Sequence, residues 1–345
     1  MEYLSGLRYD STGFVPGWAA AEHGILTAVG DGRCPENPAA TGLIVPELVD
    51  AHTHCADAGV KVRPGMTLEE LVAPPDGLKH VYLRTTPPAV LARDIGRFTA
   101  EARTYGIGTI VDFREGGAAG ARLLRQADPT AVILARPAAG GADPTELREI
   151  LATADGLAVS SLTDLPYRDA EACAEAAHAA GKLFAVHVSE RVREDLDPVL
   201  ALAPDFVVHM CEATDGDLRT CTDAGVPIVV CPRSNRFFGR VPPLARMKKA
   251  GCEVALGTDN AMLCSPDLRP EAALAAELLE QQGGDPAAVW PWLLTSGRKI
   301  LYRARGMSGA LGVGNRAVVL PCRGNDPRAA LKETGPVFRP AQGEI

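Results

Sequence analysis

The sequence is poor in aromatic residues and has no cluster of basic residues. Phe, Trp and Tyr together make up 5% of the 345 residues, and the formal net charge is -8. A surface that binds nucleic acid needs a basic patch or stripe. The composition therefore argues against a nucleic-acid partner.

Long apolar runs are also missing from the chain. No stretch approaches the ~18 consecutive apolar residues that a membrane-spanning helix requires. The first residues, Met1 to Gly6, lack the basic segment and the apolar core of a secretory signal. We therefore expect a soluble, cytoplasmic protein without a membrane partner.

Cysteines are present, but they are not arranged in pairs. There are nine of them, an odd number, and no Cys-x-x-Cys motif occurs. In a chain of this length, reduced thiols are a better explanation than a disulfide framework. Cys55, Cys211, Cys231 and Cys264 lie near the ends of predicted strands, where we expect them to be small buried apolar residues.

Eight apolar runs predict the main strands of the fold. They are nearly continuous rather than alternating, which is typical of parallel strands buried on both faces. Helical patterns lie between most of them, and Gly181, Gly225 and Gly251 predict the ends of three helices. The runs are 43–49, 107–112, 131–135, 157–161, 183–188, 206–210, 227–231 and 253–257.

This alternation of strand and helix predicts an α/β protein with a (β/α)8 barrel of the TIM type. An open, doubly wound sheet is the competing architecture. In an open sheet, however, the ends of the first, fifth, sixth and eighth strands would have no reason to meet. A closed barrel brings them together at its C-terminal mouth.

The two ends of the chain predict a small second unit. Residues 1–42 contain short strand patterns, 43–305 form the predicted barrel, and 306–345 contain one more strand and a polar tail. The strand near residues 316–321 is expected to pair with the N-terminal strands in a composite β subdomain. The long interval 55–106 between the first two barrel strands predicts either a lid or a plain surface excursion.

Ligand-type side chains follow four of the predicted strands. His52 and His54 are two residues apart in a strand, so they project in the same direction. A bare His-x-His is a weak signal, because two surface histidines would also explain it. Three later runs end in His187, His209 and Asp259, and four such strand ends together predict a metal site.

Three imidazoles, from His52, His54 and His187, and the carboxylate of Asp259 suit one divalent ion, Zn²⁺ or alternatively Fe²⁺. Such an ion lowers the pKa of bound water towards ~7 and so provides hydroxide at neutral pH. The ligands must be neutral imidazoles and an ionised carboxylate. Metal binding should therefore weaken in acid.

Two further residues are candidates for proton transfer. Glu190 follows His187 closely and would reach a substrate atom beside the metal, where a carboxylate moves protons from water to a ring nitrogen and to a leaving amine. The alternative is a glutamate at the start of a helix. His209 would be a further metal ligand, a base or a hydrogen-bond donor, or else a buried structural histidine.

Taken in order, these motifs resemble those of the amidohydrolase superfamily, and most closely its mononuclear deaminase branch, with the cytosine, guanine and S-adenosylhomocysteine deaminases. Cys231-Pro232-Arg233-Ser234-Asn235 is similar to the Cys-Pro-x-Ser-Asn of the adenosylhomocysteine deaminase and chlorohydrolase group. The resemblance spans residues 43–320. The motifs are Pro46-x-x-Val49-Asp50-Ala51-His52-Thr53-His54, His187-x-x-Glu190, His209 and Leu256-Gly257-Thr258-Asp259-Asn260.

The resemblance implies a barrel with a composite β subdomain and metal ligands at His52, His54, His187 and Asp259. It also implies that Glu190 and His209 act on water and substrate, and that Asp259 accepts a proton from the water. The fourth run, 157–161, ends in no lysine. Binuclear relatives use a carboxylated lysine there, so one metal ion is expected.

The sequence also departs from the resemblance and from another deaminase fold. Glu47 stands where relatives usually have glycine, and Arg316-Ala317-Val318-Val319 replaces their Ala-Asp-Leu-Val strand. Neither departure touches the metal set. The separate cytidine-deaminase fold needs a Pro-Cys-x-x-Cys motif, which the sequence lacks.

Four polar residues are candidates for substrate contacts. Arg114, Arg136 and Arg233 follow the second, third and seventh runs, where a guanidinium suits a carboxylate or phosphate of the substrate. Solvated loop cations are the alternative for each arginine. Asn235 is expected to contact a polar edge of a heterocycle.

The sequence thus predicts a hydrolytic deaminase in which metal-bound hydroxide attacks an amino-bearing carbon of a purine-, pterin- or pyrimidine-type heterocycle and ammonia leaves. One alternative is hydrolysis of a ring C–N bond, as in imidazolonepropionase-like members of the superfamily. The other is a non-catalytic ligand-binding barrel. The expected partner is a small-molecule substrate, and a homo-oligomer is compatible with the sequence.

Overall fold

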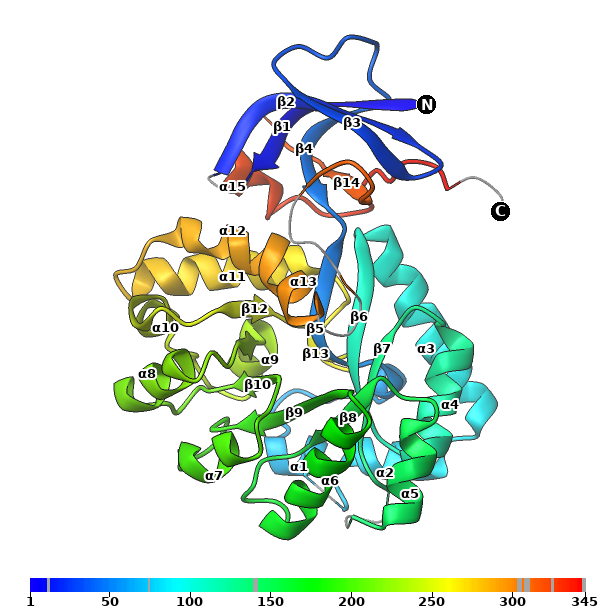
Figure 1. The fold of residues 1–345 in the computed structure, drawn as a ribbon, viewed down its shortest axis with the longest axis vertical. Coiled ribbons are helices and arrows are strands. Elements are labelled where there is room, and N and C mark those ends of the chain that lie inside the picture. Colours follow the sequence, from blue (N-terminus) through cyan, green and yellow to red (C-terminus); the bar gives the residue numbers. More distant parts are fainter. Residues whose placement is uncertain are drawn as a thin grey trace.

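The computed structural model describes residues 1–10, 13–73, 75–138, 142–302, 306, 311–323 and 326–342. These residues form two β-sheets, and helices surround the larger one (Figure 1). The smaller sheet lies at one end of the molecule, and the two ends of the chain come together there (Figure 1). The structure thus has the expected α/β class, with a small composite β subdomain beside the larger sheet.

The smaller sheet has the strand order β14-β4-β1-β2-β3. β1 pairs antiparallel with β2 and parallel with β4, and β14 pairs antiparallel with β4. The C-terminal strand therefore joins the N-terminal ones, as predicted. The strands are β1 (Glu2–Asp10), β2 (Gly13–Glu22), β3 (Ile25–Asp31), β4 (Ala40–Pro46) and β14 (Ala317–Leu320).

The first apolar run, 43–49, is divided between the two sheets. β4 ends at Pro46 in the smaller sheet, and β5 (Leu48–His54) starts the larger one. Proline has no N–H to donate, so it suits the end of a strand. The prediction of one strand over 43–49 was therefore wrong, because continuous hydrophobicity does not show where a chain crosses between sheets. His52 and His54 consequently lie inside β5.

The larger sheet has the order β12-β11-β10-β9-β8-β7-β6-β5-β13 and consists of parallel pairs. β13 returns to β5, so the sheet curls into the expected TIM-type barrel. Its remaining strands are β6 (Ile107–Arg114), β7 (Val132–Ala135), β8 (Gly156–Val159), β9 (Leu183–Val188), β10 (Phe206–His209), β11 (Ile228–Val230), β12 (Val254–Leu256) and β13 (Asp259–Asn260).

Closure of the barrel depends on the split eighth strand. β12 pairs with β11, whereas β13 pairs with β5, and Gly257 and Thr258 lie between the two pieces. The Asp50 carboxylate accepts hydrogen bonds from Thr258 N at 3.0 Å and from Thr258 Oγ at 2.6 Å. Both residues are buried, so water does not compete for these bonds. The seam between the first and last strands places Asp259 beside His52.

Helices pack around the outside of the barrel (Figure 1). α8 illustrates the local signals: Thr214 and Asp217 form a capping box at its start, and Gly225, with φ 66°, follows its end. The longer helices are α3 (Pro88–Thr104), α4 (Gly117–Ala127), α5 (Pro144–Leu151), α6 (Tyr167–Ala179), α8 (Asp215–Asp223) and α11 (Leu268–Gln281). The shorter ones are α7 (Leu196–Ala201), α9 (Pro232–Phe237), α10 (Leu244–Ala250), α12 (Val289–Pro291), α13 (Gly297–Ile300) and α15 (Pro327–Ala330).

The long connection between β5 and β6 contains two helices that the sequence patterns did not reveal. These are α1 (Leu68–Val72) and α2 (Leu78–Thr85), which precede α3. They lie at the end of the barrel opposite the smaller sheet, and we call residues 68–73 and 75–85 the mouth segment (Figure 1). The connection therefore adds helical structure at the mouth of the barrel, where the strands end.

Apolar side chains fill both faces of the barrel strands. In β6, Val111 and Phe113 belong to the cluster inside the barrel, whereas Ile110 belongs to the cluster between strands and helices. Phe113 and Phe206 pack across the interior with ring centroids 6.0 Å apart. Burial of each such side chain contributes ~1.5–3 kcal/mol. This packing explains why the strand sequences are continuously apolar, and it forms the floor beneath the site.

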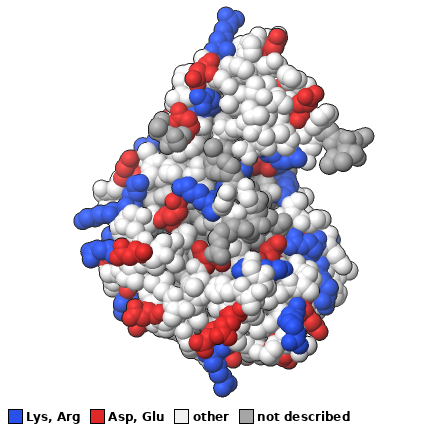
Figure 2. Space-filling model, in the orientation of Figure 1, with Lys and Arg blue, Asp and Glu red and all other residues white. Residues whose placement is uncertain are grey.

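Polar groups cover the outside. Blue and red side chains are interspersed over the face drawn in Figure 2. No helix in the described ranges is long and apolar enough to cross a membrane. The nine cysteines are free, and all of them except the partly exposed Cys34 and Cys322 are buried, as expected for small apolar residues.

We expect Gly257→Ala to destabilise the protein. A Cβ at this position would lie 2.7 Å from His52 Cβ and 2.8 Å from the backbone N and O of His52. Such overpacking costs ~1–3 kcal/mol. Gly96→Ala in α3 is the control, because a Cβ there meets no atom within 4 Å, and it should stabilise the helix by ~1 kcal/mol. Chemical denaturation measures both, and equal stability of the Gly257 variant and the native protein would contradict the steric argument.

Candidate active site

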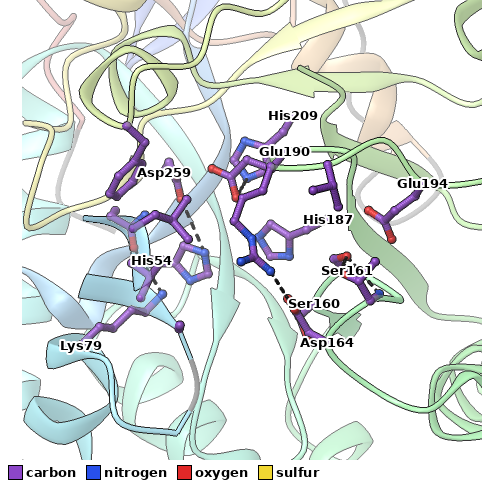
Figure 3. Close-up of a pocket in the computed structure, with 18 of the residues that line it drawn as sticks. His54, Lys79, Ser160, Ser161, Asp164, His187, Glu190, Glu194, His209 and Asp259 are labelled. Atoms are coloured by element: carbon purple, nitrogen blue, oxygen red, sulfur yellow. Dashed lines mark hydrogen bonds and ion pairs between the residues drawn. The ribbon is translucent and has the colours of Figure 1, made fainter. Parts of the chain in front are cut away.

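Five ligand-type side chains converge at the C-terminal ends of the barrel strands, and Figure 3 shows His54, His187, His209 and Asp259 among them. His52 and His54 come from β5, His187 from β9, His209 from β10 and Asp259 from β13. The ring of His52 lies at the centre of the group. Its centroid is 4.9 Å from that of His54, 5.0 Å from that of His187 and 5.9 Å from that of His209.

Asp259 completes the cluster on the side of the barrel seam. Its Oδ1 lies 3.3 Å from His52 Nε2 and 3.6 Å from His54 Nε2. Two sets of three side chains offer ligand atoms that lie within 4.8 Å of one another: His52 with His54 and His187, and His52 with His209 and Asp259. The structure therefore brings together all the residues that the sequence proposed for a metal site.

The environment of His52 fits a bound metal ion. This residue is fully buried, yet neither of its ring nitrogens has a hydrogen-bond partner of acceptable geometry among the described residues. A buried polar atom without a partner is costly, and coordination of an ion would satisfy one nitrogen. Three imidazole nitrogens with one or two carboxylate oxygens form a donor set typical of zinc and iron.

Backbone carbonyls orient two of the imidazoles. His54 Nδ1 lies 3.0 Å from the oxygen of Phe113, and His187 Nδ1 lies 3.1 Å from the oxygen of Val159. A carbonyl only accepts hydrogen bonds, so the proton of each neutral ring is on Nδ1. The Nε2 lone pairs are therefore free for a ligand. This arrangement of imidazoles and outer acceptors is typical of metal sites.

The protonation states of the cluster also suit a metal. Burial lowers the pKa of His52 to about 3, and burial together with the neighbouring imidazoles holds the pKa of His187 well below its ordinary value. Burial alone would raise the pKa of Asp259, but its contacts with His52, His209 and His54 hold that pKa well below the usual range. At neutral pH, His52 and His187 are therefore neutral imidazoles and Asp259 is a carboxylate.

Backbone strain is concentrated at the same strand ends. Ser189, His209, Met210 and Asp259 have φ values of 50°, 78°, 55° and 63°. Non-glycine residues rarely adopt such conformations, and they persist only where the surroundings enforce them. Their position at the ends of β9 and β10 and at the start of β13 ties the strain to the residues that carry the site.

Glu190 lies beside the cluster on the loop after β9. Its Oε2 is 3.7 Å from His209 Nε2, and burial raises the pKa of the Glu190 carboxyl. The loop is held by a reciprocal pair of hydrogen bonds in which Ser189 N donates to the Glu194 carboxylate and Glu194 N donates to Ser189 Oγ. α7 begins only at Leu196, so Glu190 is not a helix-start residue, which was the alternative drawn from the sequence.

Asn235 contacts His209 rather than the cavity. Its Nδ2 lies 3.1 Å from His209 Nδ1, and both side chains are buried. An amide NH₂ only donates, so this pairing makes Nδ1 the acceptor and leaves the ring proton on Nε2, which faces Glu190. The expected contact of Asn235 with a heterocycle is replaced by a role in orienting His209.

The three candidate arginines have different positions. Arg136 lines the cavity above the cluster, together with Ser160, Asp164 and residues of the mouth segment. Arg114 is buried and donates to the backbone oxygen of Gly120. Arg233 pairs with the buried Glu271 at 2.7 Å and lines a different recess. Among the arginines predicted to bind substrate, the structure thus brings Arg136 alone into the cavity lining.

A second recess adjoins the first cavity. The two share Arg136, Ser160 and Asp164, and the recess has a volume of about 440 Å³. Leu83, Leu165 and several small apolar residues line much of it. The space available to a ligand therefore continues sideways from the cluster, past Arg136.

Sequence reasoning missed Lys79 and Glu115. Lys79 lines the cavity from α2 (Figure 3). Glu115 follows β6 and contacts both Lys79 and His54. Burial opposes ionisation of Glu115, but Lys79, His54 and Arg136 hold its pKa well below the usual range. Glu115 could have been noticed because it also follows a barrel strand. Lys79 belongs to a helix whose placement no sequence pattern indicated.

The family model of the amidohydrolase family matches residues 43–317, which cover the barrel and reach into β14. The chain belongs to the amidohydrolase family. A protein of Methanothermobacter thermautotrophicus with the provisional name aminohydrolase is 32% identical over 279 residues, which are 72% of each chain. With the family comes the reaction class, hydrolysis of a C–N bond other than a peptide bond.

Solved structures of deaminases have the same fold as this amidohydrolase. A zinc-bound adenosine deaminase from Xanthomonas campestris superposes with a TM-score of 0.76 at 19% identity, over 99% of this chain and 91% of that one. An aminofutalosine deaminase from Helicobacter pylori, in complex with methylthio-coformycin, gives a TM-score of 0.75 at 17% identity over the whole of both chains.

The protonation state of His52 predicts how the metal-free amidohydrolase responds to acid. A histidine in the unfolded chain has a pKa near ~6.5, whereas folding lowers that of His52 to about 3. Below pH ~6.5 the unfolded state therefore binds a proton that the folded state does not. Stability from this group is complete above that pH and is lost as the pH falls towards 3.

We expect native protein treated with a chelator to lose ~1.4 kcal/mol more stability between pH 7.5 and 5.5 than a His52→Gln variant treated in the same way. Urea unfolding at the two pH values measures the losses. Comparing losses rather than absolute stabilities removes the effect of the substitution on packing and the effects of other titrating groups. Equal losses in the two proteins would show that His52 is not held neutral by the fold.

Proposed function

We propose that the protein is a metal-dependent hydrolytic deaminase that acts on an amino-bearing carbon of a purine-, pterin- or pyrimidine-type heterocycle. The observation that carries this proposal is that three of the proposed metal ligands, His54, His187 and Asp259, line one cavity together with Glu190, while His52 offers a ligand atom to the same groups. The names of the two structurally similar proteins, both deaminases, support this choice within the family.

His52, His54, His187 and Asp259 would hold one divalent ion, zinc or alternatively iron. When bound, such an ion supplies a Lewis acid and lowers the pKa of water to ~7. The neutral state of His52 and the ionised state of Asp259 support this assignment, since both are required of ligands at neutral pH.

Asp259 and Glu190 divide the proton transfers between them. The attacking water forms a C–O bond at the amino-bearing carbon and gives up a proton, which the ionised Asp259 accepts. Glu190, whose pKa is raised by burial, donates a proton to the adjacent ring nitrogen. The C–N bond to the amino group then breaks, Asp259 returns the proton from the water so that ammonia leaves, and the remaining hydroxyl proton passes to Glu190 as the carbonyl forms.

Two residues keep these carboxylates in place. Ser234 Oγ donates a hydrogen bond to Asp259 Oδ2, so Oδ1 remains directed at the histidines. His209, with its proton on Nε2, faces Glu190 and the space above the cluster, where it donates a hydrogen bond to the attacking oxygen. Asn235 fixes that tautomer.

Arg136 would contact a polar or acidic substituent of the substrate. It lies where the cavity over the metal ligands opens into the second recess, so a heterocycle beside Glu190 would direct its substituent past this guanidinium. Arg114 and Arg233 do not share this role, because their guanidinium groups contact the protein elsewhere.

Ammonia release tests the proposed reaction. We expect the metal-loaded protein to release ammonia from at least one member of a panel of amino-substituted purines, nucleosides, pterins and pyrimidines that includes acidic derivatives. A coupled ammonia assay measures this, and product mass confirms replacement of an amino group by oxygen. Ring opening without ammonia would instead indicate cyclic amide hydrolysis. No reaction across the panel, with one metal ion bound, would contradict the proposal.

Glu190→Gln tests the proton transfer separately from metal binding. We expect the variant to retain its metal and to lose turnover by ~10²–10⁴-fold, because glutamine cannot carry the proton to the ring nitrogen. Glu212→Gln, the same change at an exposed glutamate on the next loop, should leave turnover unchanged. Metal analysis and steady-state kinetics measure both variants, and undiminished turnover of the Glu190 variant would remove this residue from the mechanism.

A further inference from the structure

Glu115 contacts the proposed metal ligand His54 from the side away from the metal. It is buried just after β6, and its Oε1 lies 3.0 Å from His54 Nδ1 and 2.6 Å from Lys79 Nζ. His54 Nδ1 is also 3.0 Å from the oxygen of Phe113. The imidazole N–H therefore donates to the Phe113 carbonyl, and the Glu115 carboxylate lies beside it in ionic contact, without hydrogen-bond geometry.

The Glu115 carboxylate beside Nδ1 distinguishes His54 from the other two histidines among the proposed metal ligands. His187 Nδ1 donates to the neutral carbonyl of Val159, and His52 has no acceptor of good geometry in the described part of the chain. A carboxylate behind a histidine ligand increases the basicity of the ring and compensates the charge of the ion. Loss of the Glu115 charge should therefore weaken metal binding even though Phe113 still orients the ring.

Lys79 connects this carboxylate to the mouth segment. It is the second residue of α2, its side chain is 4% exposed, and it reaches into the site beneath His54 (Figure 3). Its Nζ also lies 3.4 Å from Asn260 Oδ1 and 3.9 Å from the fully buried Asp57. A buried ammonium group surrounded by these oxygens is stable only while α2 stays docked.

Other cations near Glu115 are farther away. Arg114 Nη1 lies 3.6 Å and Arg136 Nη1 lies 3.8 Å from its carboxylate oxygens. Both come from the barrel itself and stay in place whether or not the mouth segment is docked. Lys79 is thus the contact of Glu115 that depends on the position of α2.

A second ionic contact holds the mouth segment at its rim. Glu69 of α1 lies 3.3 Å from Arg191, which also contacts Asp164 at 3.2 Å. The side chain of Glu69 is 61% exposed, and exposed ion pairs contribute little to stability. This rim contact is therefore a suitable control for the buried one.

We propose that Glu115 and Lys79 are positioning residues for the metal ligand His54, and that their ion pair couples metal binding to docking of the mouth segment. The proposal rests on the metal site of the proposed function but assigns two residues that this function does not use. The mouth segment thereby senses whether the site is loaded.

The coupling follows from charge. An ion held by His54 would withdraw electron density from its ring, so the ring would become more positive beside the Glu115 carboxylate and attract it more strongly. Glu115 in turn holds Lys79, and docked Lys79 keeps the carboxylate aligned with His54. If docking of the mouth segment increases the metal affinity by some factor, metal binding must increase the equilibrium constant for docking by the same factor. Linked equilibria are reciprocal.

The first test measures metal affinity by competition with a chromophoric chelator. We expect Glu115→Gln to weaken zinc binding about 10–100-fold, and Lys79→Met to weaken it in the same direction. Glu69→Gln should bind zinc like the native protein. The absorption bands of the cobalt-loaded proteins give a second readout, since Glu115→Gln changes the ligand strength of His54 and should shift them, whereas Glu69→Gln should not.

The second test measures hydrogen exchange of residues 68–85 in the full chain, with and without zinc. Zinc should slow exchange in the native protein and in Glu69→Gln, and this protection should disappear in Lys79→Met. Leu71, which is buried, and Tyr82, which donates to Asp94, are unchanged in these variants and keep the segment folded.

The double variant K79M/E115Q separates positioning from simple destabilisation. If the single changes act only by leaving a buried charge unpaired, the double variant should recover both stability and metal affinity. If the proposal holds, it recovers stability while zinc binding remains as weak as in Glu115→Gln. Native zinc affinity in both Glu115→Gln and Lys79→Met would overturn the proposal. Hydrogen exchange of residues 68–85 that is the same in the native protein with and without zinc would also overturn it.

Failure of this inference is distinct from failure of the proposed function. A native protein that binds no zinc, or a His187→Ala variant that binds it with native affinity, would contradict the metal site itself. Native zinc binding that needs His187 but neither Glu115 nor Lys79 would overturn the coupling alone.

Discussion

The seam between the first and last barrel strands is the constraint on which the rest of the structure depends. Two hydrogen bonds from Thr258 to the buried carboxylate of Asp50 hold β13 against β5. Gly257 lets the backbone pass within van der Waals distance of His52. Without this close approach, Asp259 would not reach the two histidines of β5. One buried contact thus closes the fold and completes the cluster.

The cluster is stabilised by a balance between burial and charge. Burial keeps His52 neutral, and the surrounding histidines keep Asp259 ionised, so neither group needs solvent. Burial also raises the pKa of Glu190, which lies beside His209 in the cavity lining. Positive φ angles at His209 and Asp259 show that the backbone accepts strain in order to place these side chains.

The mouth segment and the recess decide what can reach this chemistry. Lys79 enters the site from a helix outside the regular β/α repeat, and Arg136 stands between the cavity and the recess. Both contact Glu115, at 2.6 Å and 3.8 Å. The buried carboxylate of Glu115 therefore contacts three groups: the proposed metal ligand His54, Lys79 of the mouth segment, and Arg136 between the cavity and the recess.

The sequence by itself predicted the barrel, the pairing of the two chain ends, and the grouping of the histidines with Asp259. The hydrophobic pattern and the position of a residue at a strand end are local properties of a chain. It misplaced the start of β5, because continuous hydrophobicity does not show where a chain crosses between sheets. It also placed Asn235 and Arg233 in the substrate site, because their hydrogen-bond partners, His209 and Glu271, are distant in sequence. The roles of Lys79, Glu115 and Asn235 were decided only when the tertiary structure removed water and brought their partners within hydrogen-bond distance.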